Sequence, residues 1–207
     1  MSAYFGQFET DRYIEEYFPP EYIGNCIEVG AVNGIELSNT FKFEIMGWNC
    51  LCIEPQTGTG YFDDLILNRQ NAINFAVASE NKDDVPFNVV SFNDVPANAI
   101  SGLELDQRLI DQHQYLNPTI KQTTVCTRRL DWCIDYYFPH DKIDFISIDV
   151  EGTELDVLLS FDINAYNTKL IVVENNFEDA EIEIFFAKNG WKKDKRIVVN
   201  DFYVRNS

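Results

Sequence analysis

The chain has 207 residues, 45% of them hydrophobic, and its 16 basic and 34 acidic side chains give a formal net charge of −18. This length suits a single domain with its own core, and such a charge disfavours a nucleic-acid substrate because the protein's field repels phosphate. No apolar stretch is long enough to cross a membrane, and residues 1–12 lack the basic start and apolar run of a secretory signal, so we expect a soluble cytoplasmic protein without a membrane partner.

Strand-like runs alternate with helix-like ones along the chain, after a helical lead-in over residues 1–24. Compact apolar runs that are bounded by turn residues predict strands. Only Asn200–Asp201 separate the last two runs, which predicts a terminal antiparallel hairpin with its turn at these two residues. In chain order, the strand-like or extended runs cover residues 25–29, 50–53, 72–78, 85–92, 123–130, 143–148, 170–173, 196–199 and 202–204.

One of the intervening helices has a recognisable start. Thr153, with Asp156 three residues later, resembles a capping box, and Leu155, Leu158 and Leu159 would give the helix its inner face. Repeated strand-helix units of this kind predict an α/β fold with a doubly wound, mainly parallel sheet and helices on both faces. Ligands of such sheets bind beyond the carboxyl ends of the strands.

Residues 93–119 lack clear periodicity. Pro96, Gly102 and Pro118 interrupt this stretch, which is typical of loops. Because binding and catalytic residues are often found on such segments, we predict an irregular excursion that covers the active site at one end of the sheet.

The first strand ends in a glycine turn of the form E-x-G-x-x-x-G, with Glu28, Gly30 and Gly34 at the fixed positions. Glycines let the backbone approach a ligand closely. Dinucleotide enzymes favour G-x-G-x-x-G, whereas Val32 stands here in place of the middle glycine. A carboxylate just ahead of the turn suits an ammonium or sulfonium group rather than a pyrophosphate.

The second strand ends at Glu54, which lies 54 − 34 = 20 residues after the glycine turn. An acid at this spacing commonly binds ribose hydroxyls. Each of the two motifs alone is equally compatible with turn chemistry or helix capping. Together, in register, they indicate a nucleoside.

Two later strand ends carry further acids and amides. Asp149 and Glu151 follow residues 143–148, and Glu174-Asn175 follows residues 170–173, so these groups converge on one edge of the sheet. Asp149 and Glu151 can alternatively cap the helix that comes next. The oxygens of Asp149, Glu174 and Asn175 would also suit Mg²⁺, although nothing in the sequence requires a metal.

Four strand-end runs, taken together in this order and spacing, resemble the FkbM family of methyltransferases. The most specific run contains Asp149-Val150-Glu151-Gly152-Thr153-Glu154-Leu155, and the similarity extends from Asn25 to Tyr203. The four runs are Ile27–Gly34, Cys52–Pro55, Ser147–Leu155 and Val172–Asn175.

The resemblance implies a seven-stranded class I methyltransferase fold that transfers a methyl group from S-adenosylmethionine. The acceptor in this family is usually a hydroxyl oxygen on a sugar, a lipid-linked compound or a secondary metabolite. The implied cofactor-binding residues are Glu28, Gly30, Ala31, Asn33 and Gly34 at the methionine portion, Glu54 and Pro55 at the ribose, and Ala76 and Val77 at the adenine.

Methylation of an alcohol requires a base, because the hydroxyl loses its proton as the methyl group arrives. Asp149, Glu151 and His113 from the irregular excursion are the candidates, although an isolated histidine in a polar stretch is often a surface residue. We expect a small-molecule or glycan acceptor and leave a homodimer open. Two other interpretations remain open: a non-catalytic binding module on the same fold, and a nicotinamide-dependent oxidoreductase.

Overall fold

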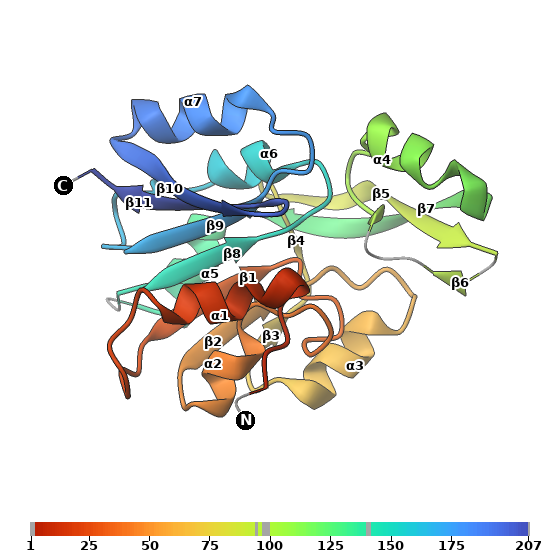
Figure 1. Ribbon diagram of the computed structural model, residues 1–207. Helices are drawn as coiled ribbons and strands as arrows, with labels where there is room; N and C mark the ends of the chain where they lie inside the picture. The colour runs from red at the N-terminus through yellow and green to blue at the C-terminus, as the bar shows by residue number, and fades with distance from the viewer. Residues whose placement is uncertain (1–2, 94, 97–99, 140–141, 207) are drawn as a thin grey trace.

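The structure is a computed structural model that describes residues 3–93, 95–96, 100–139 and 142–206. It contains a seven-stranded sheet and a smaller four-stranded sheet beside it (Figure 1). None of the helices in this part of the chain combines the length and the hydrophobicity that a membrane span needs.

The main sheet has the spatial order β10-β11-β9-β8-β1-β2-β3. Its strands are parallel except for β11, which runs antiparallel to both of its neighbours. This confirms the predicted doubly wound, mainly parallel sheet with a C-terminal antiparallel hairpin. The strands are β1 (Asn25–Val29), β2 (Asn49–Ile53), β3 (Ala72–Ile73), β8 (Phe145–Ile148), β9 (Leu170–Glu174), β10 (Trp191–Ile197) and β11 (Asn200–Arg205).

Helices cover both faces of this sheet. Alternate residues of each buried strand point to opposite faces, so both faces are apolar and both need to be covered. Ile27 of β1 packs with α5, α6 and α7, whereas its neighbour Cys26 packs with α1 and α2. Leu65 of α3 lies beside Cys52 on the side of α1 and α2. The helices are α1 (Thr10–Glu15), which follows the short η1 (Gln7–Glu9), α2 (Phe41–Ile45), α3 (Tyr61–Asn68), α5 (Leu130–Tyr137), α6 (Glu154–Leu158) and α7 (Ala180–Lys188).

The second sheet has the order β4-β7-β5-β6 and its own apolar clusters, separate from those of the main sheet. The two long strands, β5 and β7, are antiparallel and carry α4 and η3 in the connection between them. The excursion predicted over residues 93–119 is therefore partly regular, although residues 94 and 97–99 lie outside the described chain. Its elements are β4 (Ala76–Val77), β5 (Lys82–Phe92), β6 (Val95–Pro96), α4 (Gln107–Gln112), η3 (Gln114–Leu116) and β7 (Pro118–Arg128).

The strand predicted over residues 72–78 is wrong as a single element. β3 pairs with β2 in the main sheet, and the chain then leaves that sheet, so that β4 pairs with β7 in the second one. The break falls at Asn74, whose Oδ1 accepts a hydrogen bond from the backbone N of Gln56 at 2.7 Å. The apolar residues on both sides of Asn74 concealed this change of sheet.

The predicted turn at Asn200–Asp201 is also wrong. The turn lies at Val198–Val199, and Val198 is exposed with a φ of 54°. Asn200 and Asp201 are buried in β11, where Asn200 donates to Thr10 Oγ1 and Asp201 accepts from Arg196. Polar residues that look like turn formers here are buried hydrogen-bonding groups.

The capping box predicted at α6 is absent as well. The side chain of Thr153 makes no cap bond, and Asp156 accepts instead from the backbone N of Ser79 at 3.1 Å. Leu158 is buried, but Leu159 of the predicted inner face is 54% exposed. The α-helix is only five residues long, so the periodicity of the leucines overstated its extent.

Candidate functional site

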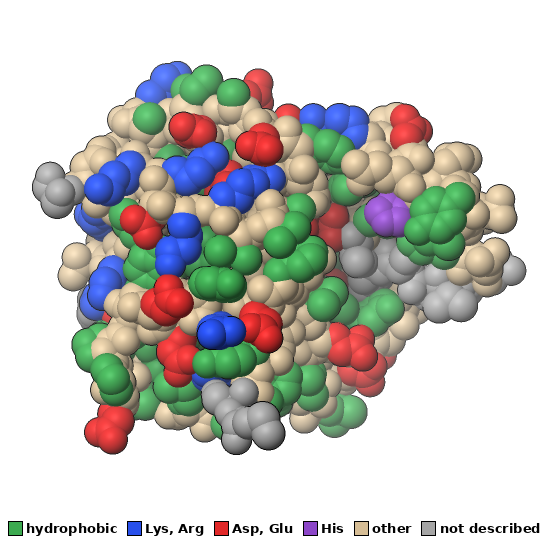
Figure 2. All heavy atoms as spheres, viewed as in Figure 1, with side chains coloured by type: hydrophobic (Ala, Val, Ile, Leu, Met, Phe, Trp, Pro, Cys, Tyr) green, Lys and Arg blue, Asp and Glu red, His purple; other side chains and the backbone are tan. Residues whose placement is uncertain are grey.

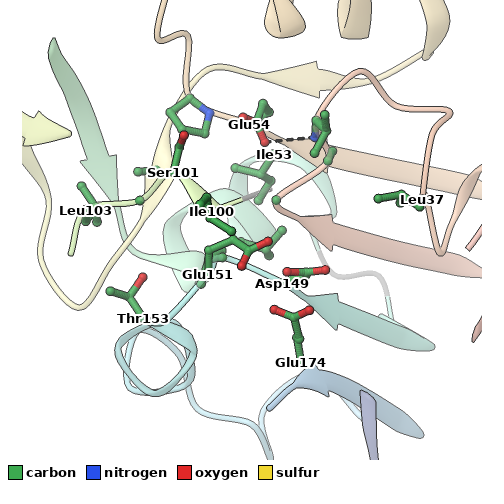
Figure 3. A pocket seen from close by; sticks show the side chains of 18 of the residues that line it. Leu37, Ile53, Glu54, Ile100, Ser101, Leu103, Asp149, Glu151, Thr153 and Glu174 are labelled. Atoms are coloured by element: carbon green, nitrogen blue, oxygen red, sulfur yellow. Dashed lines mark hydrogen bonds between the residues drawn. The ribbon is translucent and has the colours of Figure 1, made fainter. Parts of the chain in front are cut away.

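A cavity of about 290 Å³ lies at the carboxyl ends of β1, β2, β8 and β9 (Figure 3). The second sheet and the segment that carries α4 close its other side. Parallel α/β sheets bind ligands at this edge. Among the predicted site residues, the cavity is lined by Glu28, Gly30, Ala31, Glu54, Pro55, Ala76, Val77, His113, Asp149 and Glu151.

Two predicted cofactor residues, Asn33 and Gly34, do not line the cavity. Asn33 Oδ1 accepts from the backbone N atoms of Ile35 at 3.0 Å and Glu36 at 2.9 Å, so it shapes the turn from within. Gly34 has a φ of 81°. In the structure both residues therefore belong to the turn rather than to the cavity wall.

Gly30 occupies a position at which no other residue type fits. Its φ is 85°, and a Cβ atom built there would lie 1.7 Å from the carbonyl oxygen of Asp149. The backbone at the end of β1 thus passes directly against the backbone at the end of β8. Only glycine allows this approach, which brings the glycine turn and Asp149 to one site.

The backbone N–H groups of the glycine turn bond within the protein. Those of Gly30 and Ala31 donate to the carbonyl of Ile53 at 2.9 and 3.2 Å, and that of Val32 donates to Glu54 Oε2 at 3.0 Å. A pyrophosphate-binding turn needs such groups free to face the ligand. The turn is therefore unsuited to a dinucleotide.

Glu28, predicted at the methionine portion of the cofactor, is held almost entirely by the protein. Its carboxylate accepts from the hydroxyls of Ser38 and Thr40, both at 2.7 Å, and from the backbone N of Asn39 at 2.6 Å. Arg69 completes the set with an ion pair at 3.3 Å. The side chain thus fixes the loop between β1 and α2.

Arg69 was not identified from the sequence. Its side chain is fully buried and donates to Glu44 Oε2 at 2.8 Å, to the carbonyl of Gly34 at 2.9 Å and to the groups around Glu28. A Cβ atom on Gly34 would lie 2.5 Å from Arg69 Cγ, so glycine leaves room for this arginine. No local motif marks Arg69, because its partners are distant in the sequence.

Glu54 lies at the end of β2 and is 6% exposed. Burial raises its pKa to about 8, against the opposing effect of the hydrogen bond from Val32. Its position at the cavity wall, directly beside the glycine turn, is the one expected for an acid that binds ribose hydroxyls.

Three carboxylates meet at the ends of β8 and β9. The side chains of Asp149, Glu151 and Glu174 each place an oxygen within 4.8 Å of the others, and Figure 3 shows them pointing toward one another. Burial and then repulsion between like charges raise the pKa values of all three, that of Asp149 to about 7 and that of Glu174 to about 10. Glu174 therefore carries a proton that it shares with Asp149 in a hydrogen bond.

Glu154 positions this cluster from behind. Its Oε1 accepts from the backbone N atoms of Val150 at 3.2 Å and Gly152 at 3.0 Å, which fixes the loop that presents Glu151. Glu151 itself has a φ of 62°, a strained conformation for a residue with a side chain. The E-G-x-E spacing of the sequence is the signal that places Glu154 here.

Asn175, which the sequence analysis grouped with Asp149 and Glu174 as an oxygen ligand, points elsewhere. Its Oδ1 accepts from the backbone N of Asp179 at 2.8 Å, and its Nδ2 donates to Asp201 at 3.2 Å. The third oxygen donor at this edge is instead Glu151.

His113 follows α4 on the opposite side of the cavity and is the purple side chain in Figure 2. Its Nδ1 lies 2.9 Å from the carbonyl oxygen of Leu109, and its ring stacks on that of Phe92, with 5.6 Å between the ring centroids. Because a carbonyl only accepts, Nδ1 carries the proton and Nε2 has a free electron pair in the neutral ring. His113 is thus a hydrogen-bond acceptor on the lobe of the second sheet.

Comparison with known proteins agrees with this geometry. A search of curated proteins finds no match. A family model described as the methyltransferase FkbM domain matches residues 28–194, from the end of β1 into β10. Membership of this family implies S-adenosylmethionine as the methyl donor. The chain therefore belongs to the FkbM family of methyltransferases.

Proposed function

We propose that the protein methylates a hydroxyl oxygen of a small hydroxylated metabolite, such as a sugar or the end of a glycan. The observation that carries this proposal is the position of the cluster of Asp149, Glu151 and Glu174 on the same cavity as the glycine turn and Glu54. A cofactor site and a group that can accept a proton thereby share one space.

The residues around the cavity suit S-adenosylmethionine. Glu54 offers a carboxylate to ribose hydroxyls, and Phe75, Ala76 and Val77 offer an apolar surface to a flat base. Carboxylates at the ends of β8 and β9 favour the positive charges of the methionine portion and the sulfonium. The glycine turn, whose N–H groups are bonded internally, disfavours the pyrophosphate of a nicotinamide cofactor.

The protein's own contribution is to hold the acceptor and remove its proton. When bound, S-adenosylmethionine supplies a methyl carbon on a positively charged sulfur, which keeps the electron pair of the broken bond. Asp149 accepts the hydroxyl proton, since a pKa of about 7 leaves much of it ionised at neutral pH. Glu174 donates a hydrogen bond to Asp149 and fixes its orientation. We therefore expect the rate to rise with pH through about 7, as Asp149 loses its proton.

A metal-assisted version of the same reaction is the second candidate. The three clustered carboxylates offer the hard oxygens that Mg²⁺ prefers. A bound cation would keep all three side chains ionised, and Glu174 would then no longer share a proton with Asp149. Activity that disappears with EDTA and returns with Mg²⁺ would favour this version, and full activity in EDTA would favour Asp149 as an unassisted base.

Titration calorimetry tests the cofactor part directly. S-adenosylmethionine and S-adenosylhomocysteine should both bind the full chain, and NAD should not. Binding of NAD alone would indicate an oxidoreductase. A folded protein that binds none of the three would be a non-catalytic module, and the proposed function would be wrong.

A further inference from the structure

The described wall of the cavity has many acidic side chains and neither lysine nor arginine. Six acidic side chains line it, whereas His113 is the single basic residue among the described lining residues. The gaps in the described chain do not change this, because residues 93–107 contain neither lysine nor arginine in the sequence. On the face shown in Figure 2, most basic side chains gather instead over the C-terminal strands β10 and β11. The acidic lining residues are Glu28, Glu36, Glu54, Asp149, Glu151 and Glu174.

Five backbone N–H groups at this edge of the cavity are already bonded within the protein. In the glycine turn, the N–H groups of Gly30 and Ala31 bond to a carbonyl, and that of Val32 bonds to Glu54. In the loop after β8, the N–H groups of residues 150 and 152 both bond to Glu154. At each strand end, a buried carboxylate of the protein occupies the place that a bound anion would take at a phosphate-binding loop.

The nearest arginine on α4 is already neutralised. Arg108 forms bidentate hydrogen bonds with Asp106 and with Asp179, at N–O distances from 2.6 to 3.0 Å. It does not line the cavity. Recruiting it for a ligand would require breaking two ion pairs.

The opposite wall is mainly apolar, with Ser101, Gln112 and His113 as its polar side chains. Its side chains come from the second sheet and from the segment that leads to α4, and Figure 3 shows Leu103 well apart from Asp149 and Glu174. An acceptor therefore meets acids on one side and a mainly apolar surface on the other. The apolar residues are Phe87, Phe92, Ile100, Leu103 and Leu109.

We propose that the acceptor is an uncharged or cationic alcohol with an apolar flank, and that phosphate esters and nucleotide-linked forms of that alcohol are not substrates. This rests on the proposed function. An anionic group would lie among acidic side chains, without a lysine or arginine to pair with it. The methylation step therefore precedes the attachment of a phosphate or nucleotide to the acceptor, or follows its removal.

Paramagnetic relaxation in NMR tests the charge preference without knowledge of the acceptor. The full chain, saturated with S-adenosylhomocysteine, is measured with aminomethyl-PROXYL and with carboxy-PROXYL, two nitroxides of similar size and opposite charge. The cationic probe should relax the amide protons of Leu103 and Thr153 more strongly than the anionic one. Equal effects, or a stronger effect of the anionic probe, would overturn the proposal.

A pair of variants ties this preference to the site. In spectra recorded at a mildly alkaline pH, which favours ionisation of the carboxylate cluster, Glu151→Gln should reduce the difference between the two probes at Leu103. Glu181→Gln makes the same charge change at an exposed position of α7 and should leave that difference unchanged. Equal responses of the two variants would mean that the preference comes from the net charge of the molecule, which would overturn the assignment to the cavity.

Turnover gives the second readout. Aryl glycosides, their amino-sugar counterparts and their 6-phosphates form matched sets for methyl transfer from labelled S-adenosylmethionine. We expect kcat/KM for the phosphate to be at least about tenfold lower than for the neutral partner. Faster methylation of the phosphate would refute the proposal. A failure of the proposed function would appear separately, as absent S-adenosylhomocysteine binding.

Discussion

Acidic side chains lie at three neighbouring strand ends of the main sheet, those of β1, β8 and β9, yet their surroundings are opposite. Glu28 at the end of β1 is surrounded by donors, including the guanidinium of Arg69. Asp149 and Glu174, at the ends of β8 and β9, face each other and Glu151. A satisfied carboxylate stabilises a loop, whereas a cluster of acids without a cation stores unfavourable energy that a substrate or proton can release. The structural acid, Glu28, and the reactive acids, Asp149 and Glu174, therefore differ in their hydrogen-bonding partners rather than in residue type.

The largest expected effect comes from the reactive side of this comparison. Asp149→Asn removes the proposed base and should lower kcat by about 10²- to 10⁴-fold. His113→Gln, across the cavity, should lower it far less, because His113 lies on the other lobe. Steady-state rates of methyl transfer measure both. The reverse order of the two losses would make His113 the base.

Substitutions in the network around Glu28 should mainly change the stability of the protein. Arg69→Met leaves Glu28 and Glu44 buried without their cation and should lower the free energy of unfolding by about 3–5 kcal/mol. Arg12→Met, which breaks the exposed pair with Glu9, is the matched control and should leave the free energy of unfolding nearly unchanged, because solvent screens this pair. Urea denaturation compares the two variants. Similar small losses would show that the network around Glu28 is not what holds the loop.

A smaller effect should appear in the pH dependence of stability. The pKa of Glu174 is about 10 in the folded protein against an ordinary 4.5, so between these values the folded state keeps a proton that the unfolded state has released. Stability should therefore fall as pH rises through this window, by at most about 1.4 kcal/mol per pH unit for this group.

Glu174→Gln, which cannot ionise, should flatten that fall. Denaturation curves at pH 5.5, 7 and 8.5 measure it, with Glu181→Gln as the exposed control. If wild type and Glu174→Gln lost stability in parallel, repulsion within the cluster would not be the cause.

The smallest effect concerns cofactor affinity. Glu54→Ala should raise the Kd of S-adenosylhomocysteine by about tenfold, which corresponds to about 1.4 kcal/mol. Glu36→Ala, an exposed acid on the same cavity wall, should change it less. Calorimetry on both variants decides between a specific role of Glu54 and a general effect of negative charge.

The sequence was sufficient to predict the strand ends but not their contacts across the fold. Apolar runs that end in Gly30, Glu54, Asp149 and Glu174 predict one edge, because parallel strands bring their carboxyl ends together. Nothing local identifies Arg69, since its partners lie 25 to 41 residues away along the chain.

The second sheet was missed for a related reason. β4 pairs with a strand that begins more than 40 residues later, and its two residues look like the end of β3. Propensity describes a segment, whereas pairing depends on which distant segment it meets. The same limit explains the misplaced turn at Asn200–Asp201, whose polarity serves buried partners.

The separate apolar clusters of the second sheet have an evolutionary consequence. Leu103 packs with Phe87, Val89 and Val125, and none of these side chains belongs to the clusters beneath the main sheet. Mutations in this lobe can therefore reshape one wall of the cavity while leaving the glycine turn, Glu54 and Asp149 in place. A lineage, or an engineer, can change which molecule is methylated by exchanging this lobe while keeping the machinery that methylates it.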